Sequence, residues 1–161
     1  MASTSAWRSS NMSSAMPDPA WRIARITAID DALLTRLHHD WPDDPWVPEQ
    51  AQAFVANPDN LLLLATTPDL ICGIVISHRL QRLDTLRAEV LLYSIDVHES
   101  MRRQGVGHAL VEATTAWARE LGADCTWVLT ERSNHAAMAL YRAAGGTDDI
   151  PDVAMFTFSK G

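Results

Sequence analysis

The feature that most constrains the fold is a long strand that runs through two glycines into a helix. Residues 88–97, "AEVLLYSIDV", have the composition of a buried strand, and "RRQGVG" precedes a helical apolar pattern. Glycine destabilises a helix, so two of them at its start indicate a close approach of another group to the backbone. The first turn of a helix has unpaired N–H groups and a partial positive charge, and Arg102 and Arg103 add charged donors. The stretch therefore predicts a phosphate-binding helix start.

Two common phosphate-binding motifs do not fit this stretch. The dinucleotide fingerprint requires a third glycine three residues after the second, where this chain has Leu110. A nucleoside-triphosphate loop requires Gly-Lys-Ser/Thr, and the chain contains no such triplet. A glycine-containing helix start with surface arginines, without a ligand, remains the alternative.

The rest of the chain predicts one α/β (α+β) domain. Residues 1–19 are Ser-rich and lack periodicity, which is typical of a flexible tail, and residues 20–161 form the domain. Apolar periodicity and turn residues give the order β-α-α-β-β-β-α-β-α-β, and hence a mixed sheet with helices on both faces. We expect strands at 21–27, 60–67, 71–80, 87–97, 124–130 and 152–159, and helices at 27–39, 49–56, 105–121 and 134–145.

Composition and charge limit the kinds of partner that this chain could bind. The 161 residues carry a net charge of −7, which argues against nucleic acid and favours a cationic small molecule. No apolar run is long enough to span a membrane. Cys72 and Cys125 lie in apolar runs, so we expect both to be buried, and a reducing cytoplasm fits this usage. A homodimer stays open.

Two motifs together carry a family resemblance. "RRQGVG", directly after "IDV", resembles motif A of the GCN5-related N-acetyltransferases (GNAT), which binds the pyrophosphate of acetyl-coenzyme A. "NHAAMALYRAAGG" resembles their motif B, Asn-x-x-Ala-x-x-Leu-Tyr-x-x-x-Gly. The resemblance implies the GNAT fold, acetyl-CoA as co-substrate and no metal. The cofactor-binding residues that it implies are Ile95, Val97, Arg102, Arg103, Gln104, Gly105, Val106, Gly107 and Asn134.

Acetyl transfer to an amine also requires an acid, a base and a polarised carbonyl group. By the resemblance, Tyr141 is the general acid, and a phenol is protonated at neutral pH. Asp96 and Glu131 are the two candidate bases, although either could be a surface carboxylate. We expect a bulge in the strand near Ile95 and Val97 that directs an N–H group at the thioester oxygen.

A narrower resemblance is to the type I aminoglycoside 3-N-acetyltransferases. It rests on Glu89 and Tyr93 in the strand, on Ala-Leu-Tyr in the second helix and on Phe156. An aminoglycoside is a polycation, which an acidic cleft would favour. A polyamine or a protein or peptide as the acceptor, and a non-catalytic acyl-CoA-binding module, are the alternatives. The substrate-binding candidates are Asp43, Asp44, Trp46, Asp148 and Asp149, with Asp40 and Trp41 beside them.

Overall fold

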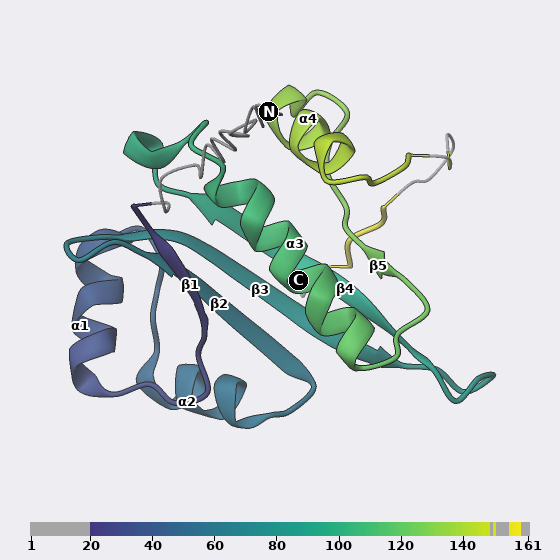
Figure 1. The fold of residues 1–161 in the computed structure, drawn as a ribbon. Helices are drawn as coiled ribbons and strands as arrows, with labels where there is room; N and C mark the ends of the chain where they lie inside the picture. The colour runs from purple at the N-terminus through teal and green to yellow at the C-terminus, as the bar shows by residue number, and fades with distance from the viewer. Residues whose placement is uncertain (1–19, 149, 151–154, 159–161) are drawn as a thin grey trace, which may run out of the picture.

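The computed structural model describes residues 20–148, 150 and 155–158. One five-stranded sheet, in the order β1-β2-β3-β4-β5, carries helices on both faces (Figure 1). The predicted mixed α/β architecture is confirmed. Its elements are β1 (Arg22–Arg25), α1 (Asp31–Asp40), α2 (Pro48–Ala56), β2 (Asn60–Thr66), β3 (Ile71–Gln81), β4 (Ala88–Val97), a 3-10 turn (Glu99–Met101), α3 (Val106–Glu120), β5 (Thr126–Trp127) and α4 (His135–Ala143).

The sheet changes direction at its last strand. β1 to β4 pair antiparallel, whereas β5 is parallel to β4 and pairs with it only at Val90 and Leu91. Two parallel neighbouring strands require a crossover connection, and α3 provides it between β4 and β5. Within the described residues, β4 has no paired strand on the side of β5 from Leu92 onward.

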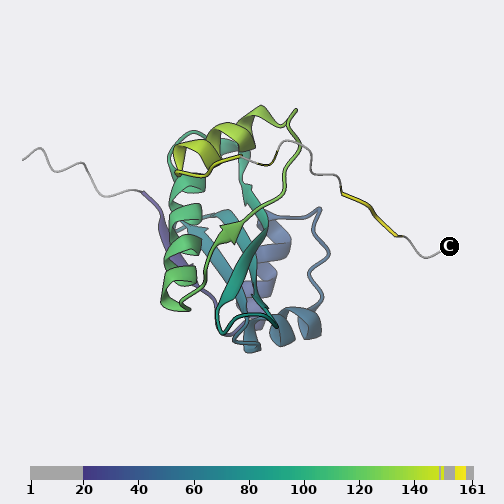
Figure 2. The same ribbon diagram turned by 90° about the vertical axis from the view of Figure 1, so that its right-hand side faces the viewer.

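Two hydrophobic clusters fill the two faces of the sheet. Figures 1 and 2 show the helices that cover these faces. α3 packs on one face through Val106, Leu110 and Trp117, which are 1%, 0% and 5% exposed. α1 and α2 cover the opposite face, where Leu34 and Leu37 are buried. The β2 and β3 strands have apolar residues on both sides, which is why they are continuous apolar runs in the sequence. In the described residues, no helix is long and apolar enough to cross a membrane.

Gly73 allows α3 to lie close to the sheet. A Cβ atom at this position would come within 2.9 Å of Leu110 Cδ1 and of Val106 Cγ1. Both of these side chains are buried, so neither can turn into solvent. The absence of a side chain at Gly73 therefore sets the position of the N-terminal half of α3.

Three expected element bounds differ from the structure. The first helix begins at Asp31, not after Thr27, because Asp30 caps it through Leu33 N and the Ile26 N–H still bonds to β2 at Leu62 O. β5 is two residues long rather than seven, since the strands separate after Leu91. Of the strand expected at 152–159, residues 155–158 form no strand, and Met155, Phe156 and Phe158 are exposed, whereas 152–154 and 159 lie outside the described residues.

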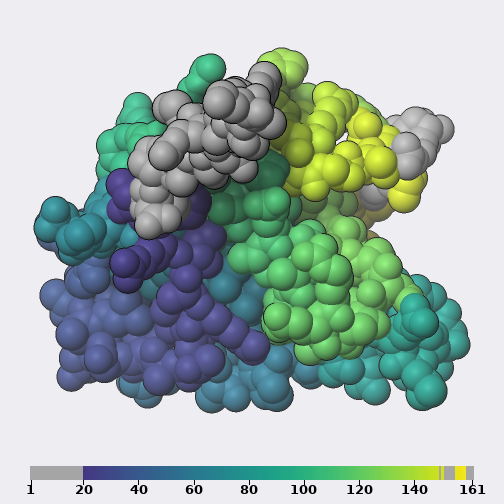
Figure 3. Space-filling model, in the orientation of Figure 1, coloured from purple at the N-terminus to yellow at the C-terminus, as the bar shows by residue number. Residues whose placement is uncertain are grey.

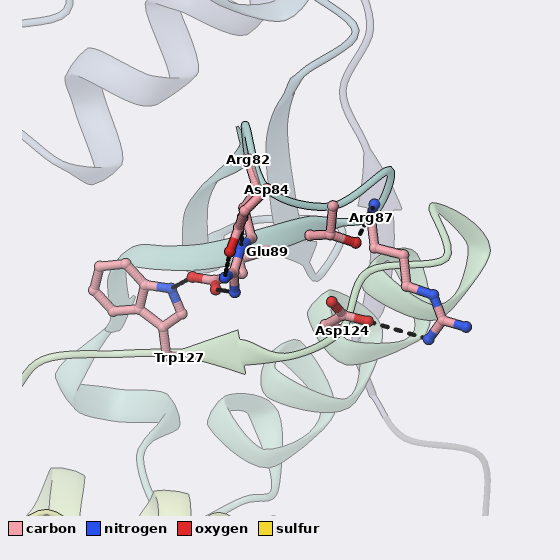
Figure 4. A network of polar contacts seen from close by, with 7 residues as sticks. Arg82, Asp84, Arg87, Glu89, Asp124 and Trp127 are labelled. Atoms are coloured by element: carbon pink, nitrogen blue, oxygen red, sulfur yellow. Dashed lines mark hydrogen bonds and ion pairs between the residues drawn. The ribbon is translucent and has the colours of Figure 1, made fainter.

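A polar network fixes β5 to the β3–β4 hairpin (Figure 4). Glu89 accepts hydrogen bonds from Arg82 Nη1 at 2.6 Å and from Trp127 Nε1 at 3.1 Å. Arg87 forms an ion pair with Asp124, just before β5. These bonds hold the paired end of β5 while its other end leaves the sheet. Cys72 is buried as predicted, but Cys125 is exposed, because it lies at the short edge strand and not in a covered one.

Candidate active site

The turn between β4 and α3 has the backbone of an anion site. Arg103 and Gly105 have positive φ angles of 61° and 83°, and Gly105 is the N-cap of α3. Turns that contain left-handed residues gather successive N–H groups around a concavity that attracts anions. Asp30 and Asn134 cap α1 and α4 with their side chains, whereas α3 has no side-chain cap. The first N–H groups of α3 are therefore the ones left for a ligand.

The side chains around this turn have different roles. Val106 is 1% exposed and packs in the core, so only its backbone can contact a ligand. Arg102 donates from Nε to Val97 O at 3.1 Å, and Gln104 donates to Ser100 O at 3.0 Å. The first bond ties the loop to the end of β4, and the second ties it to the 3-10 turn that follows β4. Arg103 is exposed at the same place and adds positive charge.

The second part of the site is the unpaired side of β4. The His98 N–H donates to Cys72 O on β3, at 3.0 Å. N–H groups alternate in direction along a strand, so those of Ile95 and Val97 point away from β3, toward the side where β5 has separated. The predicted bulge is present in β4, but it lies at Tyr93, between the pairs Ser94–Ile76 and Leu92–Ser77. It bends the strand directly after its last residue paired with β5.

α4 lies beside this open strand. A Cβ atom on Gly107 would come 3.4 Å from Leu140 Cδ2 and 3.5 Å from Val97 Cγ2, so α3, α4 and the end of β4 meet here. Tyr141 follows Leu140 and is partly buried. It also lines a cavity of about 300 Å³ between α3, β5 and α4, on the face drawn in Figure 3. The side chain of Asn134 accepts from Ala137 N at 3.0 Å, so its oxygen serves as a helix cap.

Three ionisable groups influence one another across the two faces of the sheet. Loss of solvation and the charge of Asp44 raise the pKa of the Asp96 carboxyl group, against the opposing effect of Arg102. Burial and the charge of Asp96 raise the pKa of the Tyr141 hydroxyl group. A carboxylate of raised pKa is a better base, and a phenol of raised pKa remains a proton donor. The arrangement can therefore accept one proton at Asp96 and donate another from Tyr141.

The loop between α1 and α2 brings Asp44 to this place. His38 contacts Leu34 O with Nδ1 at 2.9 Å and Trp46 O with Nε2 at 3.1 Å, which ties the loop to α1. His38 was not among the residues predicted from the sequence. Its position in the last turn of a helix, immediately before the acidic loop, is the sequence feature that marks a residue able to tie that loop to the helix.

Two residues considered as substrate contacts have structural roles. The carboxyl group of Asp40 is buried and accepts from Ile71 N at 2.8 Å and from His39 at 2.7 Å. Burial opposes its ionisation, but these hydrogen bonds outweigh the burial and lower its pKa. Trp41 donates from Nε1 to Ile71 O at 3.0 Å. Together they anchor the end of α1 to the start of β3, so neither side chain is free for a ligand.

The remaining predicted residues are distributed around the site. Asp43 is exposed beside Asp44, and Trp46 packs against the core on the face of α1 and α2. Asp148 pairs with Arg142 at 3.0 Å and Arg132 at 3.2 Å, which lowers the pKa of its carboxyl group and balances its charge. Asp149 lies outside the described residues. Glu131 is exposed and accepts from Ser133 Oγ at 3.2 Å.

Metal coordination finds no support in the described part of the chain, which holds no group of three or more His, Cys, Asp or Glu placed for it. The left-handed turn before α3, the side of β4 from which β5 separates, and the side chains of Asp96 and Tyr141 make up the candidate site. Residues 26–145 match the acetyltransferase (GNAT) family, and the chain belongs to that family. It is an acetyltransferase with the GNAT fold.

Solved structures show the same fold at low identity. An aminoglycoside acetyltransferase, meta-AAC0020 from an uncultured soil metagenomic sample, in complex with sisomicin, is 20% identical with a TM-score of 0.76, over 89% of this chain and 99% of that one. The aminoglycoside 6'-N-acetyltransferase AAC(6')-Ih from Acinetobacter baumannii is 19% identical with a TM-score of 0.66, over 88% and 99%. AAC(6')-Iy in complex with CoA is 15% identical with a TM-score of 0.67, over 86% and 100%. A search of curated protein sequences found no significant match.

Proposed function

We propose that this chain transfers the acetyl group of acetyl-CoA to a primary amine of a cationic small molecule, and that the substrate is an aminoglycoside. The observation that carries the proposal is that the end of β4, which holds Asp96, meets α4, which holds Tyr141, at Gly107, while the charge of Asp44 also acts on Asp96. Two carboxylates beside a proton donor favour a cationic amine over a neutral one.

The acyl donor is held by the backbone. The uncapped N–H groups of α3, the left-handed Gly105 and the charge of Arg103 suit a pyrophosphate. The outward N–H groups of Ile95 and Val97 suit an extended arm that lies along β4 in the place of a strand. Gly105 would permit the phosphates to approach the backbone without a Cβ atom in the way.

The chemical step requires three proton movements. Asp96 accepts a proton from the ammonium group, directly or through one water molecule, and the exposed amine lone pair then forms a bond to the thioester carbon. An N–H group of β4 stabilises the oxyanion that develops. The carbon–sulfur bond breaks as the carbonyl group re-forms, and Tyr141 donates its proton to the departing sulfur. The tyrosinate then takes the remaining extra proton from the nitrogen of the new amide, which restores the Tyr141 phenol. Glu131, which is exposed and accepts a hydrogen bond from Ser133 Oγ, is the alternative base.

The aminoglycoside assignment is supported by the overall charge of −7 and by structural relatives that are named aminoglycoside acetyltransferases, one of them in complex with sisomicin. The 3-amino group is the position that the motif resemblance favours. Two of the relatives described above carry the 6'-N designation, so the 6'-amino group is the competing position.

Release of coenzyme A thiol tests the proposal with an aminoglycoside, spermidine and a peptide as acceptors. We expect turnover with the aminoglycoside, and two-dimensional NMR of the product then identifies the acetylated nitrogen. Turnover with spermidine or the peptide alone would refute the substrate class. Acetyl-CoA binding without transfer to any of the amines would instead indicate the non-catalytic module.

A further inference from the structure

An apolar cavity lies on the face of the sheet that carries α1 and α2. It measures about 330 Å³. This volume lies at the lower end of the range for small-molecule sites, which are predominantly apolar with a few polar groups at one side. Its walls come from the α1–α2 loop, from α2 and from the central strands, and the residues that define it best are Trp46, Ala51, Phe54, Leu62 and Ile76.

The cavity is next to the part of the candidate site that holds the carboxylates of Asp44 and Asp96. The backbone N–H of Trp46 donates to the backbone oxygen of Asp44 at 3.0 Å, so the loop that supplies the aromatic wall also supplies the carboxylate near Asp96. On the opposite wall, Ile76 pairs with Ser94 on β4, and Ser94 and Asp96 lie on the same side of that strand. An acceptor whose amine lies at Asp96 therefore has an apolar space beside it.

We propose that this cavity binds an uncharged, apolar ring of the acceptor. The lining has no charged side chain, and its polar side-chain groups are those of Gln50 and Trp46, so an ammonium or heavily hydroxylated group would lose more solvation there than these two groups replace. A deoxygenated sugar ring or an aromatic ring gains from the same burial. The inference rests on the proposed function and refines it: the substrate is a cationic amine with one apolar ring face.

The test uses one substitution on each side of α2. Ala51→Leu places three additional carbon atoms in the cavity, whereas Ala53→Leu makes the same change on the exposed side of the same helix. The first readout is equilibrium binding of benzylamine, a single apolar ring with one ammonium group, to the protein saturated with coenzyme A. We expect about tenfold weaker binding to the Ala51→Leu variant and no change for Ala53→Leu.

The second readout is turnover of kanamycin B and of its dideoxy analogue dibekacin, which have the same charge. We expect the wild type and Ala53→Leu to have a lower KM for dibekacin, and Ala51→Leu to lose this preference. Absence of benzylamine binding to the wild type, or equal binding to Ala51→Leu, would overturn the cavity assignment even if aminoglycosides were acetylated. Cavity-dependent benzylamine binding without turnover of either aminoglycoside would instead overturn the proposed aminoglycoside activity and leave the cavity assignment in place.

Discussion

Replacing Gly73 with alanine should disturb the acetyl-CoA site from a distance. The new Cβ atom would lie 2.9 Å from Leu110 Cδ1 and from Val106 Cγ1, and 3.4 Å from Ala65 Cβ. Overpacking of this kind costs about 1–3 kcal/mol. For a chain of this size, each kcal/mol corresponds to roughly 2–4 °C in Tm, so we expect Tm to fall by roughly 2–12 °C.

The same substitution should also change cofactor binding. Val106 is the first residue of α3, so relief of the clash moves the start of the helix and the N–H groups that we assign to the pyrophosphate. We therefore expect Gly73→Ala to raise the KM for acetyl-CoA more than it lowers kcat. The assays are thermal unfolding followed by circular dichroism and steady-state release of coenzyme A thiol.

Gly122→Ala is the matched control at the other end of α3. Gly122 has φ of 64° and no atom within 4 Å of the position of a Cβ atom, so alanine there strains the backbone without moving the helix. We expect a stability loss of about 1–2 kcal/mol and an unchanged KM for acetyl-CoA. An unchanged Tm and KM in Gly73→Ala, or an equal rise of KM in both variants, would refute the reasoning.

The other predictions concern the turn at Arg103 and Gly105, before α3, and the proposed base and acid, Asp96 and Tyr141. Gly105→Val should weaken acetyl-CoA binding at least tenfold in calorimetry, because valine is strained at a positive φ and adds bulk at the helix start. Tyr141→Phe should bind acetyl-CoA normally and lose most of its kcat. Equal binding of acetyl-CoA by both variants would contradict the placement of the site. Asp44→Asn should move the acid limb of the kcat/KM profile to lower pH. Removal of the negative charge of Asp44 lowers the pKa of the Asp96 carboxyl group, and a base with a lower pKa stays deprotonated at lower pH. Asp43→Asn should leave that limb in place; a shift of the same size in both variants would mean that Asp96 is not the titrating base.

The elements that position the site were predictable because their signals are local. The helical apolar pattern after Gly105 gave α3 to within a residue, and Asn134 and Gly145 bracket α4 as cap residues do. Asp96 and Tyr141 were selected from spacing and resemblance. Their proximity depends on the fold, because the close approach at Gly107 brings the end of β4 and α4 together.

The bounds that sequence reasoning placed wrongly depend on contacts distant in the chain. Thr27 and Asp30 both suit a helix cap, and the hydrogen bond from Ile26 N to β2 decides for Asp30. β5 has the composition of a longer strand, but whether a strand continues depends on its neighbour, and β4 bends away at the Tyr93 bulge. Asp40 and Asp44 have the same side chain, and the hydrogen bonds that Asp40 accepts from Ile71 N and His39 hold its carboxyl group inward.

The central claim is that acetyl-CoA and a cationic amine meet between Asp96 and Tyr141. Its most direct test is a single-turnover measurement in which the protein, loaded with acetyl-CoA, is mixed with an aminoglycoside and quenched over time. We predict that the wild type forms the acetylated amide in one exponential phase, and that Tyr141→Phe binds both substrates but forms it at least a hundredfold more slowly. Amide formation at the wild-type rate in Tyr141→Phe, or none in the wild type, would contradict the account.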